Sequence, residues 1–480
     1  MSYKMILRTT GAIMLIEAAV MVLMTLVSLI YRENPVPFLI TIVILLVLGF
    51  PLSRMKPEQK SFFAKEGYVT AAITWIVLSL FGALPFYICG GFGNYVNCFF
   101  EAVSGFTTTG ATILTDIESL PRGILLWRST THFIGGMGIL VLATALIPSG
   151  NSRSQHLMRA EMPGPTAGKL VPRLSQSSKI LYAIYVALTV LEVIVLLCAK
   201  VRVFDSINIA LATAGTGGFC ITNGSIASYN SPAVEVITSI FMLLFSVNFT
   251  IYFLLLLKNF TSIKKNQELW LFIGIVAVST LLITINICSV SASFVEGLRH
   301  AFFVVASTIS TTGFVTVDYD SLWPEFSKCI VLILTAIGAC AGSTGGGIKI
   351  SRFLVLLKSV AQEIRQIIHP RSVSVIRVDD TPVNTGVTHS IMRFLAAWVF
   401  CIIGGTLLIS LDNFDFITTF SAVLTCIGNV GPGLGAVGPV LNFDVMSVFS
   451  KIILSFLMLL GRLEIFPLLI FFSPKTWRNT

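Results

Sequence analysis

Four short segments rich in threonine and glycine recur along this chain. They read Ser-Gly-Phe-Thr-Thr-Thr-Gly-Ala-Thr at 104–112, Thr-Ala-Gly-Thr-Gly-Gly-Phe at 213–219, Ser-Thr-Ile-Ser-Thr-Thr-Gly-Phe at 307–314 and, most divergent, Thr-Cys-Ile-Gly-Asn-Val-Gly-Pro-Gly at 425–433. Aligned on their shared triplets, the segments place one glycine each at an equivalent position: Gly110, Gly218, Gly313 and Gly431. This recurrence indicates one structural unit that is repeated four times.

Segments of this kind can coordinate a cation through their backbone. Glycine permits backbone angles that a side chain would oppose, so that carbonyl oxygens can turn inward and replace the hydration shell of a potassium ion. The predicted filter takes three residues from each segment: Thr108, Thr109 and Gly110; Thr216, Gly217 and Gly218; Thr311, Thr312 and Gly313; Asn429, Val430 and Gly431. We expect potassium to bind to their backbone carbonyls, and we expect no cofactor in this chain. The alternative is that these small residues only allow close helix packing, which explains one segment more easily than four.

The composition shows what must position these segments. Hydrophobic residues make up 55% of the 480 residues, charged residues 11%, and the mean hydropathy is +0.88, which is typical of a membrane protein. About 20 apolar residues cross roughly 30 Å of hydrocarbon. Ten runs are predicted to do so: 6–29, 37–53, 69–88, 124–147, 179–199, 236–257, 269–290, 327–348, 390–410 and 446–471. The nine scattered cysteines indicate neither a disulfide framework nor a zinc site.

A short amphipathic stretch precedes each segment, at 95–106, 204–214, 294–307 and 414–426. These stretches are predicted to be pore helices whose negative C-terminal ends point at the cation. With a cytoplasmic N-terminus, 22 of the 32 Lys and Arg residues fall on the inside, so the positive-inside rule predicts that both termini are cytoplasmic. Topology also explains the net charge of +9 better than nucleic-acid binding does. Acidic residues such as Glu101, Asp116 and Glu118 predict a negative outer face that concentrates cations.

Two further features stand out within the predicted spans. The run 338–347, with Gly345, Gly346 and Gly347 at its end, interrupts the span predicted at 327–348. It does not fit a phosphate-binding P-loop, because Ile348 separates Gly347 from Lys349; a simple packing kink remains an alternative. In the last predicted span lies Arg462, which cannot face Glu464 two residues away on a helix. A structural partner elsewhere in the fold is the alternative to a role in the ion path.

Taken together, these motifs resemble the Trk/Ktr/HKT superfamily of cation transporters, and in particular its TrkH branch, over nearly the whole chain. The resemblance implies an all-α membrane protein with four helix–pore-loop–helix repeats around a central pore. It assigns 1–65 to an N-terminal two-helix hairpin and 66–150, 151–262, 263–375 and 376–480 to the repeats, the third carrying an intramembrane gating loop. It also implies a pore-facing role for Arg462, a bacterial inner-membrane location and a homodimer. The cytoplasmic partner would be a TrkA-like nucleotide-binding subunit docked on 149–179 and 349–388.

The predicted function is therefore gated potassium uptake, and not catalysis. None of the segments contains the Thr-Val-Gly-Tyr-Gly run of tetrameric potassium channels, so discrimination against sodium is expected to be looser. One rival is an ion-coupled secondary transporter of potassium or sodium, in which buried acids such as Glu192 and Glu235 would serve a midplane site. A second rival is an intramembrane enzyme. It lacks support, because the six ionisable residues taken as functional candidates in or beside the predicted spans are Glu or Arg: Glu17, Glu192, Glu235, Arg393, Arg462 and Glu464. His132 is predicted to mark close helix packing behind the first segment.

Overall fold

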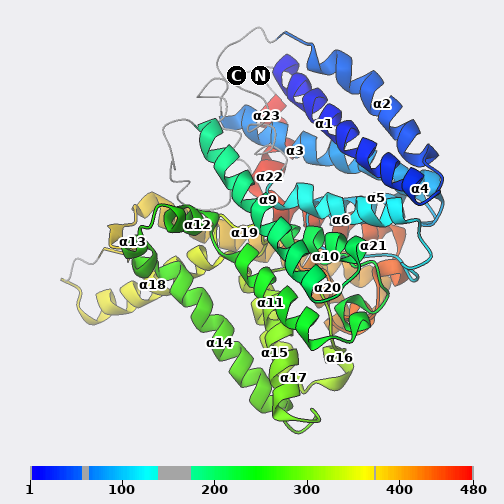
Figure 1. Cartoon of the computed structure of the whole chain (residues 1–480). Coiled ribbons are helices and arrows are strands. Elements are labelled where there is room, and N and C mark those ends of the chain that lie inside the picture. Colours follow the sequence, from blue (N-terminus) through cyan, green and yellow to red (C-terminus); the bar gives the residue numbers. More distant parts are fainter. Residues whose placement is uncertain (1–2, 57–63, 139–173, 372–374, 478–480) are drawn as a thin grey trace.

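The computed structural model describes residues 3–56, 64–138, 174–371 and 375–477, and nearly all of them lie in helices or in the turns that join them (Figure 1). The predicted all-α membrane fold is confirmed. Six of the described helices are long and apolar enough to cross a bilayer, and a seventh crossing follows if one bent helix pair counts as a span. Large apolar side chains such as Leu23, Val47, Ile285 and Phe400 are exposed on their outer surfaces, as lipid contact requires. The chain is thus a multi-pass membrane protein.

An N-terminal hairpin precedes the rest of the bundle. It consists of α1 (Tyr3–Ile30) and α2 (Val36–Ser53). The two helices approach closely at Gly11 and Gly49, where a Cβ on Gly49 would lie 3.1 Å from the carbonyl oxygen of Gly11. Small residues at such a crossing let two membrane helices pack backbone against backbone.

Four groups of helices follow, and in each a long first helix leads to a short buried helix and then to a returning helix. The first group contains α3 (Ala64–Gly82), α4 (Leu84–Cys89), α5 (Tyr95–Phe106) and α6 (Arg122–Gly136). The second contains α9 (Leu174–Cys198), α10 (Val203–Gly215), η1 (Ser225–Tyr229), α11 (Pro232–Ser246) and α12 (Phe249–Leu256), and α13 (Phe260–Lys265) links it to the third.

The third and fourth groups repeat the order with additional short elements. The third contains α14 (Gln267–Ile287), α15 (Phe294–Ile309), α16 (Tyr319–Leu322), α17 (Glu325–Ile337) and α18 (Ile350–Ile368). A two-stranded hairpin of β1 (Arg377–Val378) and β2 (Thr381–Pro382) comes next. The fourth contains α19 (Thr385–Ile409), η2 (Ser410–Asp412), α20 (Phe416–Gly428), η3 (Gly435–Val437), η4 (Phe443–Val445), α21 (Val448–Arg462), α22 (Phe466–Phe472) and α23 (Pro474–Trp477). The domain boundaries inferred from the sequence stay predictions.

The short buried helices α5, α10, α15 and α20 begin at defined caps. The side chains of Asn94, Ser293 and Asp415 accept hydrogen bonds from backbone amides in the first turns of α5, α15 and α20. An oxygen in this position satisfies an amide that has no partner within its helix. All four helices have most of their residues buried, and each ends at one of the threonine- and glycine-rich segments.

Several predicted spans are interrupted or shorter than expected. The span 236–257 bends by 90° between α11 and α12. The span 327–348 ends its helix at Ile337, where Gly338 has a positive φ of 71°. The span 446–471 breaks after α21, because Pro467 near the start of α22 has no amide to donate and cannot continue a helix. The span 124–147 is helical to Gly136, and its residues from 139 on lie outside the described residues.

The two ends of the chain meet at one face of the molecule (Figure 1). The rings of Tyr3 at the start of α1 and Trp477 at the end of α23 stack with centroids 6.3 Å apart. The expectation that both termini lie on the same side therefore agrees with the fold, and the assignment of that side to the cytoplasm stays a prediction.

Candidate ion-binding site

The four predicted glycines come together as a closed ring. A Cβ on Gly110 would collide with the carbonyl oxygen of Gly217 in the second segment. In the same way Gly218 faces the carbonyl of Thr312, Gly313 faces that of Val430, and Gly431 faces that of Thr109. Each loop thus contacts the next, and the fourth returns to the first. The φ angles are 79°, 77°, 82° and 101° along the chain, a region that favours glycine.

The short buried helices α5, α10, α15 and α20 all end in the same way. The residue two before each ring glycine has a left-handed backbone: Thr108, Thr216, Thr311 and Asn429, with φ between 54° and 59°. The following amide then folds back to the carbonyl five residues earlier. These bonds run from Thr109 to Ser104, Gly217 to Ala212, Thr312 to Ser307 and Val430 to Thr425, at 2.9, 2.9, 2.9 and 3.0 Å. A left-handed residue after a helix is a common way of ending it, and here it ends each helix two residues before its ring glycine.

Side chains behind the ring tie neighbouring loops together. The side-chain amide of Asn429 donates to the hydroxyl of Thr109 at 2.9 Å and to the carbonyl of Met458 at 3.0 Å. In the first loop the hydroxyls of Thr107 and Thr109 lie 2.8 Å apart. The threonine and asparagine side chains are buried, whereas Gly110, Gly218 and Gly313 are partly exposed. The backbone, rather than a side chain, therefore borders the open space at these three glycines.

The non-helical segment between α17 and α18 lies directly beneath the third and fourth loops. The amide of Gly346 donates to the hydroxyl of Thr311 at 2.7 Å, and a Cβ on Gly346 would collide with the carbonyl of Gly428. We refer to residues 338–349 as the intramembrane segment. The segment also contacts the bend between α11 and α12. The backbone amide of Cys340 donates to the carbonyl of Ser246 at 3.1 Å, and the backbone amide of Phe249 donates to the carbonyl of Gly342 at 3.0 Å. Two broken helices thus satisfy each other's backbone, as the membrane interior demands.

Arg462 joins this segment to the first loop. Its guanidinium donates to the carbonyl of Thr344 at 2.8 Å and to the hydroxyl of Thr108 at 3.2 Å. Its second terminal nitrogen donates to the carbonyls of Gly135 and Gly136 at 2.5 and 2.7 Å. The planar fork of an arginine suits such a set of acceptors, which a lysine could not satisfy at once.

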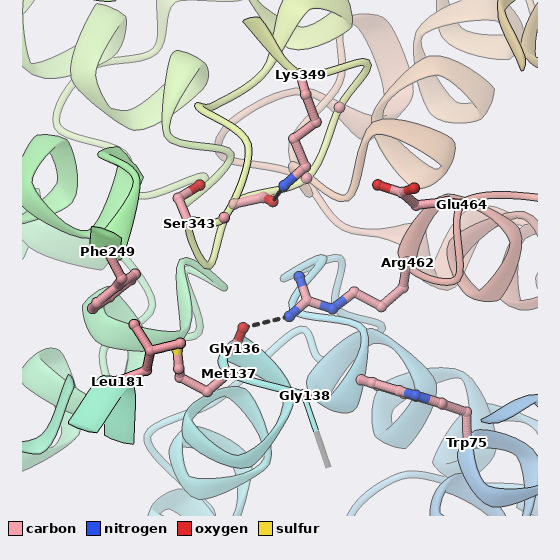
Figure 2. A pocket seen from close by; sticks show the side chains of 15 residues that line it. Trp75, Gly136, Met137, Gly138, Leu181, Phe249, Ser343, Lys349, Arg462 and Glu464 are labelled. Carbon is pink, nitrogen blue, oxygen red and sulfur yellow. Dashed lines mark hydrogen bonds between the residues drawn. The ribbon is translucent and has the colours of Figure 1, made fainter. Parts of the chain in front are cut away.

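A pocket opens beside these contacts. Figure 2 shows the Arg462 guanidinium bonded to the carbonyl of Gly136, with Leu181 and Phe249 on the opposite wall of the pocket. The Lys349 ammonium donates to the carbonyl of Gly345. The charged side chains of Lys349, Arg462 and Glu464 and an apolar wall together line the space beneath the ring.

Comparison with known proteins establishes the family. Residues 35–479 match the family model described as TrkH, cation transport protein. The chain belongs to the TrkH family. It is similar to the Trk system potassium uptake protein TrkH of Salmonella typhimurium strain LT2, with 36% identity over the full length of both chains. Its identity to the Trk system potassium uptake protein TrkG of Escherichia coli strain K12 is 34% over 94% of each chain. The crystal structure of the potassium transporter TrkH from Vibrio parahaemolyticus matches the whole fold, with a TM-score of 0.89 and 32% identity.

This TrkH-family chain also brings together buried side chains whose pairing the sequence did not reveal. Glu101 was predicted on the negative outer face, which is wrong: the side chain is fully buried and pairs with the buried Arg128 at 2.7 Å. Glu101 also accepts from the amide of Ile113 at 3.1 Å, and Arg128 donates to the carbonyl of Cys220 at 3.1 Å. The pair supports the first and second loops behind the ring. The signal available was a glutamate in an amphipathic stretch and an arginine in an apolar run, 27 positions apart. Each of the two charges needs a partner when it is buried.

His132 has a more specific place in the TrkH-family fold than close packing. Its Nε2 accepts from the amide of Phe219 at 3.1 Å, so Nδ1 carries the proton and donates to the carbonyl of Gly105 at 2.7 Å. The imidazole of His132 therefore connects α5 to the second loop, and its two partners set its tautomer.

The remaining ionisable residues of the predicted spans lie outside the ring. Glu235 pairs with Arg299 at 2.9 Å and Glu464 with Arg352 at 2.5 Å, while Arg393 is exposed. Within the described residues, neither carboxyl oxygen of buried Glu17 has a hydrogen-bond partner. Glu192 is fully buried beside Thr213 of α10. None of these side chains contacts the four glycines.

Acidic groups do remain at the mouth of the first two loops. Asp116 accepts from the side-chain amide of Asn223 at 3.1 Å, and this hydrogen bond lowers the pKa of its carboxyl. Glu118 accepts from the backbone amide of Asn223 at 3.0 Å. A charged carboxylate at this position raises the local concentration of cations.

Proposed function

We propose that this TrkH-family chain takes up potassium across the bacterial cytoplasmic membrane through the four-glycine ring, which acts as the selectivity filter. The observation that carries the proposal is the closed contact of Gly110, Gly218, Gly313 and Gly431 with the carbonyls of their neighbours. Potassium would enter from the face bearing Asp116 and Glu118, exchange its water for backbone oxygens, and leave through the space beneath the ring. The relatives named as Trk system potassium uptake proteins support this choice of ion.

The physical basis is electrostatic. The carbonyl ends of α5, α10, α15 and α20 all meet at the ring, and the partial negative charge of a helix C-terminus stabilises a cation there. The membrane potential then drives a monovalent cation inward with about 2.3 kcal/mol per 100 mV. No chemical step on the ion is required.

The intramembrane segment and Arg462 form the gate in this proposal. Gly345, Gly346 and Gly347 lie beneath the third and fourth loops, and Arg462 places a positive charge beside them. A guanidinium there opposes the passage of a cation, and its bond to Thr344 holds the segment in place. Opening would require both to move. We propose that a cytoplasmic TrkA-like nucleotide-binding subunit controls this movement and that the chain works as a homodimer. The Trk system names of its relatives support a complex of more than one component.

The test is ion flux into liposomes that contain the purified chain. Under an inside-negative potential we expect uptake of rubidium, a potassium substitute, to exceed that of sodium, and unlabelled potassium to compete with it. Equal uptake of both ions, or uptake no faster than in protein-free liposomes, would contradict the proposal that the ring is a selectivity filter.

A second candidate is an ion-coupled transporter. The buried Glu17, without a hydrogen-bond partner in the described residues, and the buried Glu192 favour it, because carboxyls inside a membrane often relay protons. The same liposomes distinguish the two mechanisms. A proton gradient imposed at zero membrane potential drives rubidium accumulation in a coupled transporter and leaves a simple pore at equilibrium.

A further inference from the structure

A carboxylate at the start of α14 joins the two ends of the intramembrane segment. Glu268 is buried, and its Oε1 accepts hydrogen bonds from the amides of Ala341 at 2.6 Å and Ser351 at 3.1 Å. Ala341 lies in the first part of the segment, and Ser351 lies in the first turn of α18. Amides in the first turn of a helix lack an intrahelical partner and carry partial positive charge. Glu268 therefore caps α18 and holds the segment with one oxygen.

The backbone closes the same base of the segment. Lys349 donates to the carbonyl of Ile337 at 2.9 Å, and Ile350 donates to the carbonyl of Ala339 at 3.0 Å. The tip, in contrast, touches the third loop through the bond from Gly346 to Thr311. A loop whose two ends are fixed to each other cannot unfold from one end alone. Release of the whole segment must therefore involve the base, where Glu268 lies.

The residue next to Glu268 is held by the β1–β2 hairpin. Oδ1 of Asp379, in the turn of that hairpin, accepts from the backbone amide of Gln267 at 2.8 Å, and its Oδ2 accepts from the side chain of Asn266 at 3.3 Å. Lys358 of α18 donates to the side chain of Gln267 and, at 2.6 Å, to the carbonyl of Arg377 in β1. The hairpin, the start of α14 and α18 thus meet at Gln267.

The neighbouring Asp380 makes a different contact. It pairs with Lys265 at 2.9 Å, and both side chains are largely exposed, at 72% and 60%. The Lys265 ammonium lowers the pKa of the Asp380 carboxyl, but an exposed ion pair contributes little to stability. Two consecutive aspartates with similar left-handed backbones, φ 52° and 63°, therefore differ in one respect: Asp379 bonds the residue beside Glu268, and Asp380 does not.

We infer that Glu268 is a positioning residue for the intramembrane segment. We also infer that a contact with the hairpin Arg377–Pro382 at the molecular surface is transmitted through Asp379 to Glu268. The inference rests on the proposed gating role of 345–347. Displacing the hairpin withdraws Asp379 from the amide of Gln267 and frees the first turn of α14. Glu268 then moves away from Ala341 and Ser351, so both ends of the segment lose their shared acceptor together. A protein that binds the hairpin could thereby open the path without touching the segment.

The experiment compares five variants of the full-length chain in liposomes and in detergent: Glu268→Ala, Glu268→Gln, Asp379→Ala, the double variant Glu268→Ala/Asp379→Ala and the matched control Asp380→Ala. We expect Glu268→Ala and Asp379→Ala to raise rubidium uptake by about fivefold or more, the lower end of typical coupling between sites. The double variant should be no faster than Glu268→Ala, because both changes act through one contact. Asp380→Ala should match the parent. Glu268→Gln keeps an acceptor oxygen and should restore most of the parental rate.

Hydrogen–deuterium exchange provides a readout that does not depend on flux. Peptides covering 338–351 should exchange faster in Asp379→Ala than in Asp380→Ala. Faster exchange with unchanged uptake would support the connection between the hairpin and the intramembrane segment. It would contradict the proposed gating role of 345–347. Unchanged exchange in Asp379→Ala, or equal effects of Asp379→Ala and Asp380→Ala, would overturn the inference, as would additive effects in the double variant.

Discussion

Arg128 and Glu101 form a fully buried ion pair, with Nη2 and Oε1 2.7 Å apart and side-chain exposures of 1% and 0%. The guanidinium also lies over the ring of Phe219, 4.1 Å from its centroid. The pair thus links the first pore helix, the returning helix α6 and the second loop. The ion pair thereby supports the first and second loops from behind the ring of four glycines.

Breaking this pair should damage both stability and selectivity. In Glu101→Gln the hydrogen bonds to Ile113 and Thr112 can persist, but the Arg128 charge is left without compensation. Removing one partner of a buried pair costs about 3–5 kcal/mol. We expect a lower thermal unfolding midpoint in detergent and a lower rubidium-to-sodium uptake ratio.

The matched control is Glu325→Gln, because Glu325 pairs with Lys328 at 3.0 Å but is 80% exposed. It should change stability by less than about 0.5 kcal/mol. A Glu101→Gln protein as stable and as selective as this control would show that the pair does not support the loops.

Replacing Gly110 with serine should increase sodium permeation relative to rubidium. A Cβ there would collide with the carbonyl of Gly217, and the φ of 79° opposes any side chain. The second loop must then shift, which alters the carbonyl positions around the ion. Gly404→Ser on α19 is the control, since nothing lies within 4 Å of a Cβ at that site. Identical rubidium-to-sodium ratios in the two variants would argue against the ring as filter.

Deleting Gly345, Gly346 and Gly347 should raise basal uptake. The deletion removes the amide that bonds Thr311 and the backbone packed under Gly428, so the space beneath the third and fourth loops opens. The filter itself is unchanged, and the rubidium-to-sodium ratio should stay as in the parent. A deleted protein that purifies and inserts normally but conducts no faster would identify the segment as packing.

Arg462→Ala should also increase uptake without a change in ion preference, because it removes a positive charge and the bond to Thr344. Arg462→Lys should retain part of the block as a point charge without the planar fork. The exposed Arg393 provides the control, and Arg393→Ala is expected to behave as the parent. Slower uptake by Arg462→Ala, or shifted selectivity, would place the residue in a structural role through its bonds to Gly135 and Gly136.

Local repeats in the sequence were sufficient to find the candidate ring. The triplets that end at Gly110, Gly218, Gly313 and Gly431 each follow a short amphipathic helix, so both the helix and its termination could be predicted from neighbouring residues. The break at 338–347 could be predicted for the same reason, since consecutive glycines mark a helix interruption within a few residues.

Contacts between distant segments could not be predicted in this way. Glu101 and Arg128 face each other only because α5 and α6 fold back together, and the sequence placed Glu101 with the exposed outer acids. The partner of Arg462 at Thr344 is 118 positions away. The break between α21 and α22 contains Glu464 and Ile465 with positive φ angles of 55° and 66°, which local preference would oppose. Its signal was Pro467, which lies beyond the break.

The four loops share one backbone geometry but belong to a single polypeptide with four different sequences. In an assembly of identical chains, every substitution in such a ring is copied to all positions. Here a replacement changes one quarter of the ring and leaves three loops as they were. Under the proposed function, ion preference in this architecture is therefore adjustable in small steps, either by evolution or by design. The fourth loop, with Asn429 and Val430 where others have threonine or glycine, is the place where the ring already departs from symmetry.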